Sequence, residues 1–136
     1  MIKAVVLSAS IVLGVPVVAF ATDKCADPQD QSTMNECAGM AFKASDKKLN
    51  ELYRQIETRL GDDAETKKLL IQAQRDWIKF RDAECSFQAA GVSGGSAMPM
   101  VVSMCMDGLT QTRVKDFEGY LSCEEGDMSC AVPAAN

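Results

Sequence analysis

The sequence predicts an all-α fold, a compact three-helix domain stabilised by disulfides. Apolar residues recur at spacings of three and four through two long segments and, less regularly, through a third. The strict alternation of apolar and polar residues that is typical of a half-buried strand is not visible in the sequence. The chain also has six cysteines and no histidine, and an even number of cysteines in an exported protein indicates disulfides.

Residues 1–21 are predicted to be a signal peptide that is removed from the mature protein. Lys3 provides the positive start, residues 4–20 are largely apolar, and Ala21 ends a small–x–small motif of the kind that signal peptidase accepts. Cys25 lies four residues beyond this cleavage site, so lipid anchoring through a cysteine is not expected. We therefore expect an exported protein, periplasmic or secreted, with no membrane attachment in its mature form.

Charge restricts the partners of the mature chain. Cleavage leaves 115 of the 136 residues, with one domain predicted over residues 22–121 and a partly disordered tail over 122–136. The formal net charge of the whole chain is −5, and loss of Lys3 makes it −6. Nucleic acid and anionic membranes repel such a protein, whereas a basic protein partner is compatible with it.

The cysteines are predicted to form disulfides rather than a metal site. No CxxC motif is present, and the lack of histidine also argues against zinc. The methionines of residues 98–106 suggest a soft-metal site as an alternative, but their spacing fits packing better. We expect no metal and no cofactor. The preferred connectivity, one of 15 that six cysteines permit, is Cys25–Cys37, Cys85–Cys105 and Cys123–Cys130.

The first helix is predicted over residues 33–60. Thr33 and Glu36 match a capping box, in which each side chain binds a free backbone N–H of the first turn. Gly61 supplies the left-handed conformation that commonly ends a helix. The apolar positions in between follow the helical period and are Met34, Cys37, Ala38, Ala41, Leu49, Leu52, Tyr53, Ile56 and Leu60.

The second helix is predicted from the N-capping aspartates Asp62 and Asp63 to about Ala89. Glu65 in its first turn is favourable to the helix dipole. Apolar residues cover more than one side of this helix, which predicts a central position between two neighbours. We expect its C-terminal half to be the best-buried part of the protein.

A glycine-rich loop is predicted to separate the second helix from the third. Residues 91–99, GVSGGSAMP, contain three glycines in five residues and cannot form the interior of a helix or strand. Ser96 is expected to cap the third helix, from about Ala97 to Tyr120, with Pro99 at an early position. The loop is either a plain connector or a partner-binding loop held at its base by a disulfide. Its proposed binding residues are Gly91, Gly94, Gly95 and Ser96.

The most distinctive stretch is residues 73–85, AQRDWIKFRDAEC, in the second helix. Gln74, Trp77 and Arg81 share one stripe of that helix. One interpretation is that Trp77 packs inward while Gln74 and Arg81 meet polar partners from another helix. The other is that Arg81 extends along its apolar stem to water.

These residues resemble the LprI-type lysozyme inhibitor family, a group of small exported bacterial domains. The resemblance rests on Cys25 with residues 34–38 (MNECA), on residues 46–53 (DKKLNELY), on residues 73–85 and on Gly94-Gly95-Ser96. It covers about residues 25–121. It implies a compact helical domain with stabilising disulfides, and inhibition of lysozyme by protein–protein contact.

The resemblance also draws attention to matching stripes on the three predicted helices. If these stripes face one another, Asp46 or Asp82 can pair with Arg81 and set the helix register. The alternative is that the same residues bind a partner. The stripe residues are Asp46, Asn50 and Tyr53 on the first helix, Gln74, Trp77, Arg81 and Asp82 on the second, and Arg113 on the third.

Three classes of function are compared. A basic c-type lysozyme, which has two carboxylates in a long cleft, would attract this acidic chain. A periplasmic adaptor or stress-related structural module with another protein partner is the alternative. Catalysis by Asp76, Asp82 and Glu84 is disfavoured, because their spacing does not make them face one another and no histidine is present. We therefore expect a binding protein and not an enzyme.

Overall fold

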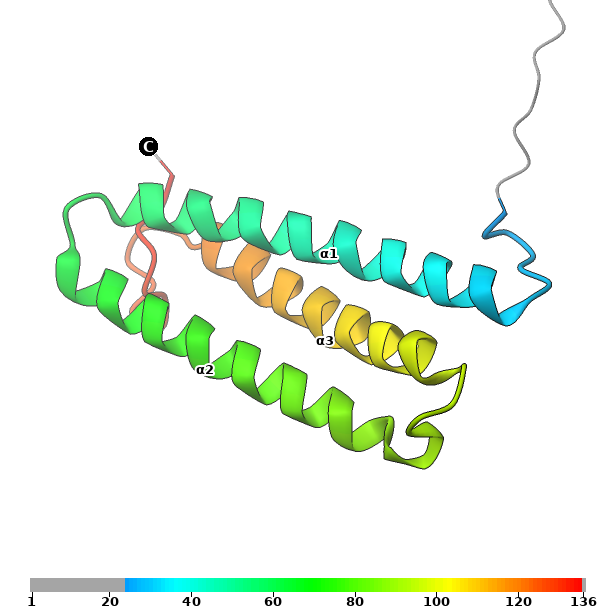
Figure 1. The fold of residues 1–136 in the computed structure, drawn as a ribbon. Helices are drawn as coiled ribbons and strands as arrows, with labels where there is room; N and C mark the ends of the chain where they lie inside the picture. The colour runs from blue at the N-terminus through cyan, green and yellow to red at the C-terminus, as the bar shows by residue number, and fades with distance from the viewer. Residues whose placement is uncertain (1–23, 136) are drawn as a thin grey trace, which may run out of the picture.

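The computed structural model describes residues 24–135 as three α-helices and one 3-10 turn. The elements are α1 (Gln31–Leu60), α2 (Ala64–Gln88), η1 (Ala90–Val92) and α3 (Met98–Leu121). The helices lie side by side, with α2 running opposite to α1 and α3 (Figure 1). No strand is present in the described part of the chain, so the predicted all-α class is confirmed. The predicted signal peptide, residues 1–21, lies outside the described residues.

The bundle has two ends, which lie at opposite sides of Figure 1. The loop end comprises the start of α1 and residues 89–97, which connect α2 to α3. The tail end comprises the α1–α2 turn, residues 61–63, and the segment 122–135 that follows α3. Gly61 in that turn has a φ of 55°, which is the positive value expected from the sequence.

Aspartate side chains begin the first two helices. The Asp30 carboxylate accepts hydrogen bonds from Thr33 N at 2.9 Å and Thr33 Oγ1 at 2.7 Å, and Asp63 does the same with Thr66 at 3.0 and 2.7 Å. These bonds, chiefly those from the backbone N–H groups, hold the pKa of both carboxyls below the ordinary value. The predicted capping box at Thr33 and Glu36 is therefore wrong. Asp30, three residues earlier, offers a charged acceptor, and Thr33 becomes its donor.

The third helix begins without a side-chain cap. Its N-cap is Ala97, and Pro99 lies in the first turn as predicted. The expectation that Ser96 caps this helix is wrong, because Ser96 precedes the N-cap position. The backbone carbonyl of Ser96 instead accepts a hydrogen bond from Asn35 Nδ2 of α1 at 3.0 Å.

The apolar core lies between α1 and α3, on the side of the bundle towards the tail end. Partly buried side chains, including Tyr53 and Trp77, pack against it. The buried cluster consists of Leu49, Leu52, Ile56, Leu60, Phe117 and Val132. Val132 is only 5% exposed, so the segment expected to form a partly disordered tail adds a side chain to this core.

The prediction that α2 is central and holds the best-buried part of the protein is wrong. The closest packing is between α1 and α3, and α2 lies mainly against α3. Leu69, Phe80 and Phe87 of α2 are 71%, 55% and 76% exposed. The apolar residues of α2 are spread around its circumference, and only one face of a helix can meet the groove that α1 and α3 form.

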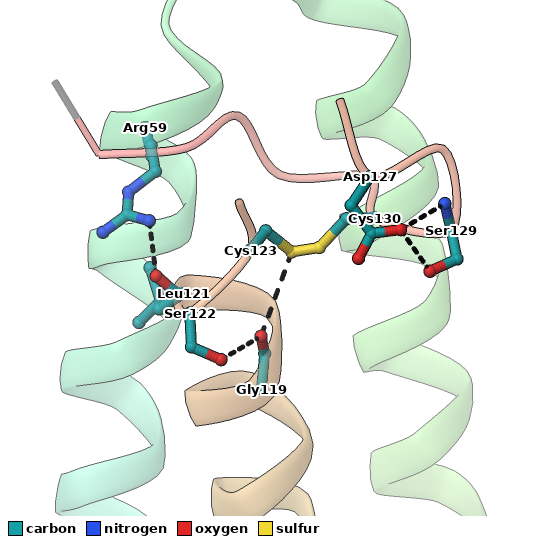
Figure 2. The surroundings of a disulfide bond; sticks show 8 residues. All are labelled: Arg59, Gly119, Leu121, Ser122, Cys123, Asp127, Ser129 and Cys130. Carbon is teal, nitrogen blue, oxygen red and sulfur yellow. Dashed lines mark hydrogen bonds between the residues drawn. A yellow bond between two sulfur atoms is a disulfide. The ribbon is translucent and has the colours of Figure 1, made fainter. Parts of the chain in front are cut away.

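Three disulfides connect the described cysteines, and their pairing agrees with the predicted one. Cys25–Cys37 ties the N-terminal segment to α1, and Cys85–Cys105 joins α2 to α3 beside the glycine-rich loop. Cys123–Cys130 closes a short turn directly after α3, shown in Figure 2. Each of the first two pairs has its Cα atoms 5.5 Å apart, and the third pair has them 6.0 Å apart.

Candidate functional site

The predicted stripes meet in a column of alternating aromatic rings and guanidinium groups that crosses all three helices. We call it the arginine–aromatic column, and its members in order are Phe42, Arg81, Trp77, Arg113 and Phe117. The guanidinium carbon of Arg81 lies 5.1 Å from the Phe42 ring centroid and 5.2 Å from that of Trp77. That of Arg113 lies 5.9 Å from the Trp77 centroid and 4.7 Å from the Phe117 centroid. These distances are in the range of cation–π contacts.

Arg81 connects α2 to α1 through the Asp46 carboxylate. Its side chain is 9% exposed, and its guanidinium pairs with Asp82 at 2.9 Å and with Asp46 at 3.4 Å. Asn50 Nδ2 donates to the Asp46 carboxylate at 3.1 Å and to its backbone carbonyl at 2.8 Å, which orients the acid towards Arg81. A buried guanidinium needs such partners, since an unpaired charge in the interior is costly. The structure therefore agrees with the interpretation in which Arg81 meets polar partners from another helix, and not with the one in which it extends to water.

Arg113 forms the corresponding link between α3 and α2. Its side chain is 13% exposed. Its Nε donates to Gln74 Oε1 at 3.3 Å, and its Nη1 lies 3.4 Å from Asp116 Oδ2. The column therefore contacts polar groups of all three helices, and each of its two cations has a carboxylate beside it.

Tyr53 extends the aromatic packing towards the core. Its ring centroid is 6.3 Å from that of Phe117, which is in turn 5.9 Å from that of Tyr120. Burial, together with the neighbouring Glu57 carboxylate, raises the pKa of the Tyr53 phenol above its ordinary value. The phenol is thus protonated at neutral pH and serves as a packing group.

In this geometry the cationic groups of the column are engaged within the chain. The guanidinium groups of the column are occupied by carboxylates, an amide and rings of the same chain. Within residues 24–135, no group of three or more Cys, Asp and Glu side chains is placed to hold a metal ion. Of the methionines considered as metal ligands, Met100 accepts a hydrogen bond from Gln31 at 3.7 Å and Met104 is 60% exposed. Across the described residues, no helix is both long and apolar enough to span a membrane.

Sequence reasoning missed Phe42, Asp116 and Phe117, which complete the column. Phe42 lies four residues before Asp46 and Phe117 four residues after Arg113, so each extends a recognised stripe by one helical turn. This spacing was the signal that could have found them. In the sequence, each of the two phenylalanines is indistinguishable from an ordinary core residue. Only the packing of the helices shows that its ring covers a guanidinium group.

The glycine-rich loop is a folded turn. Gly91 lies in η1, and Gly94 has a φ of 73°, a conformation that favours glycine. A side chain at Gly95 would come within 3.2 Å of the Val92 carbonyl, whose oxygen accepts the Gly95 N–H at 3.0 Å. The loop is exposed, but these backbone hydrogen bonds and the bond from Asn35 of α1 to the Ser96 carbonyl restrain it. Its role in binding a partner stays a prediction.

Comparison with known proteins places these features in a family. Residues 21–117 match the family model described as Lysozyme inhibitor LprI. The chain belongs to the LprI family. It is also 32% identical over 112 residues to an uncharacterized protein of Rhizobium meliloti (strain 1021), an alignment that covers 74% of this chain and 81% of the relative. No solved structure matches the chain significantly. The family match includes the whole column and ends before Cys123 and Cys130.

Proposed function

We propose that this LprI family member is an exported protein that inhibits c-type lysozyme by protein–protein contact, with no chemistry of its own. The observation that carries the proposal is the match of residues 21–117 to a lysozyme inhibitor family. The charge of −6 expected for the mature chain supports it, because a basic lysozyme is attracted to an acidic inhibitor over several ångströms before contact. Export places the protein where a lysozyme acts on the cell wall.

The rigidity of the domain supports inhibition by contact. Three disulfides and the arginine–aromatic column restrain the helices before any partner arrives. A preorganised surface loses little conformational entropy on binding, so more of its contact energy appears as affinity. On this proposal the column positions the binding surface and does not touch the enzyme.

The glycine-rich loop is one candidate for the element that enters the lysozyme cleft. Residues 93–96 are exposed at the loop end. Residues 85–106 contain no charged side chain, so this region could approach the two cleft carboxylates without like-charge repulsion. The Cys85–Cys105 disulfide holds the base of the loop.

The test is the rate at which a c-type lysozyme clears bacterial cell walls when the purified mature protein is added. We expect saturable inhibition that weakens as salt is raised, since salt screens the attraction between opposite charges. An unrelated acidic protein of similar size and net charge is the control, because it reports non-specific charge effects. Absence of inhibition at micromolar excess and low salt would contradict the proposal.

A further inference from the structure

We propose that the tail end carries the docking surface for a basic protein partner, which inserts an apolar side chain into a pocket flanked by carboxylates. The inference rests on the proposed function and places the binding surface at the tail end instead of at the glycine-rich loop. Its centre is an apolar pocket of about 210 Å³ where α1, α2, α3 and the tail segment meet. Among the residues lining it are Ile56, Leu60, Leu69, Ala73, Tyr120 and Val132.

The pocket has the properties of a site for an apolar anchor. Its walls are almost entirely hydrophobic, and Leu69 at its edge is 71% exposed. Met128, in the turn closed by the tail disulfide, is fully exposed at the same end of the bundle. Arg113 reaches the pocket wall, but its guanidinium is held by Gln74, Asp116 and the rings of the column. A concave apolar site beside exposed apolar side chains is typical of an interaction surface.

Carboxylates lie beside this pocket, in an adjoining hollow that shares Ala131 and Val132 with it and at the start of α2, and we call them its acidic rim (Asp63, Glu124, Glu125 and Asp127). Asp63 caps α2 through Thr66, which itself lines the pocket. Glu124, Glu125 and Asp127 lie exposed in the turn that the Cys123–Cys130 disulfide closes, immediately before the pocket-lining Ala131 and Val132. Figure 2 shows this turn, with the Asp127 carboxylate accepting hydrogen bonds from Ser129 N and Oγ at 2.9 and 2.6 Å. Those bonds keep the pKa of Asp127 low, so its charge persists at mildly acidic pH.

Several cations at this end make contacts within the chain, whereas Arg54 is exposed on α1 beside residues 133–135. Arg59 donates to the Leu121 carbonyl at the end of α3 at 2.6 Å (Figure 2), and Lys67 donates to the Gly61 carbonyl. Lys68 pairs with Glu65 at 2.7 Å. None of these contacts involves Glu124, Glu125 or Asp127, so the carboxylates of the tail turn are left to face a partner. By contrast, residues 85–106 at the loop end contain no charged side chain.

Charge complementarity selects the occupant. A basic protein gains favourable contacts with the acidic rim while its apolar anchor fills the pocket. A second copy of this chain would bring two acidic rims together, so self-association through this face is disfavoured. Three of the rim acids and the Cys123–Cys130 disulfide lie beyond residue 117, where the family match ends, so family membership alone does not imply this surface.

The test measures the affinity of full-length mature variants for a c-type lysozyme by calorimetry, with kinetics in parallel. We expect Leu69→Ala to weaken binding at least 10-fold, because it removes the exposed wall of the pocket. The double variant E124Q/E125Q is expected to weaken binding about 3- to 10-fold, mainly through slower association, and to reduce the salt dependence. Met40→Ala on α1 and Asp27→Asn before α1 are the matched apolar and charge controls, expected within 2-fold of wild type.

Each outcome decides between specific alternatives. One outcome is that Leu69→Ala and E124Q/E125Q bind lysozyme as tightly as the wild type does, while a loop variant such as Ser93→Arg does not bind. That result overturns the docking surface and keeps the proposed function. Absence of wild-type binding at low salt overturns the proposed function and this surface with it. A wild-type dimer in solution that Leu69→Ala converts to a monomer identifies a second copy as the occupant, and overturns the basic partner. Circular dichroism of each variant excludes loss of folding as the cause.

Discussion

The two ends of this bundle are stabilised in different ways. At the tail end, the side chains of Leu60, Phe117 and Val132 form part of a continuous apolar core. At the loop end, the fully buried positions in the described structure are small, namely Cys85 and Ala89, and a disulfide joins α2 to α3 beside them. At the loop end a covalent link joins α2 to α3, whereas at the tail end the helices are held by the apolar core and leave an open pocket beside exposed carboxylates.

Truncation of the core at the tail half should give the largest loss of stability. Phe117→Ala removes a ring that is 0% exposed and stacks on Arg113, so we expect the free energy of unfolding to fall by about 3–5 kcal/mol. The matched control is Phe87→Ala at the loop half, where the ring is 76% exposed and a loss below about 0.5 kcal/mol is expected. Urea unfolding followed by tryptophan fluorescence measures both. Equal losses of unfolding free energy in the two variants would contradict the difference in packing between the two halves of the bundle.

Removal of the loop-end disulfide should have the next largest effect. C85S/C105S opens a link spanning 20 residues, and the chain-entropy argument gives a loss of about 3 kcal/mol. C123S/C130S opens one spanning 7 residues, for which the same argument gives about 2 kcal/mol. Hydrogen exchange should show opening confined to residues near the loop in the first variant and near the tail in the second. Loss of protection throughout the bundle in both variants would show that the ends are not independent.

Val132 tests whether the tail segment belongs to the core. Val132→Ala is expected to lower the free energy of unfolding by about 2 kcal/mol, since it removes buried methyl groups and leaves a cavity. Pro133→Ala, at the exposed neighbouring position, is the control and should have little effect. Thermal unfolding of both variants measures the difference. A Val132→Ala variant as stable as wild type would mean that the tail does not pack in solution.

The smallest effect concerns the feature that the two ends share, an aspartate N-cap. Asp30 and Asp63 have pKa values lowered in the folded state, so their contribution is present above the ordinary carboxyl value near pH 3.9 and is lost as pH falls through the lowered values. Asn caps a helix about as well as Asp and does not titrate. Asp30→Asn and Asp63→Asn should therefore each reduce the loss of stability between pH 5 and pH 2, to a similar extent.

The urea midpoint measured across that pH range checks this expectation, with Asp27→Asn as the control because its carboxylate caps no helix. An unchanged pH dependence in both cap variants would contradict it. A large change in one variant alone would show that the two caps are not equivalent.

Local patterns made much of this molecule predictable. Helical periodicity located the three helices to within about two residues, because apolar spacing depends only on backbone geometry. The i, i+4 relation likewise placed Asp46 with Asn50, and Trp77 with Arg81, on single faces of their helices. The disulfide pairing could be proposed because each pair joins cysteines in the same or in consecutive predicted elements. Asp30 escaped prediction, since Thr33 with Glu36 is an equally acceptable local start.

The sequence by itself determined the all-α class, the extent of each helix, the residues that share each stripe and the membership of the LprI family. Only the tertiary structure decided that α3 packs most closely on α1, that Phe42 and Phe117 cover the two guanidinium groups, and that Val132 returns to the core. The physical reason is that a helix with apolar residues on several sides can pack in more than one way. The choice among these ways depends on the summed burial of all three helices, which no local pattern contains.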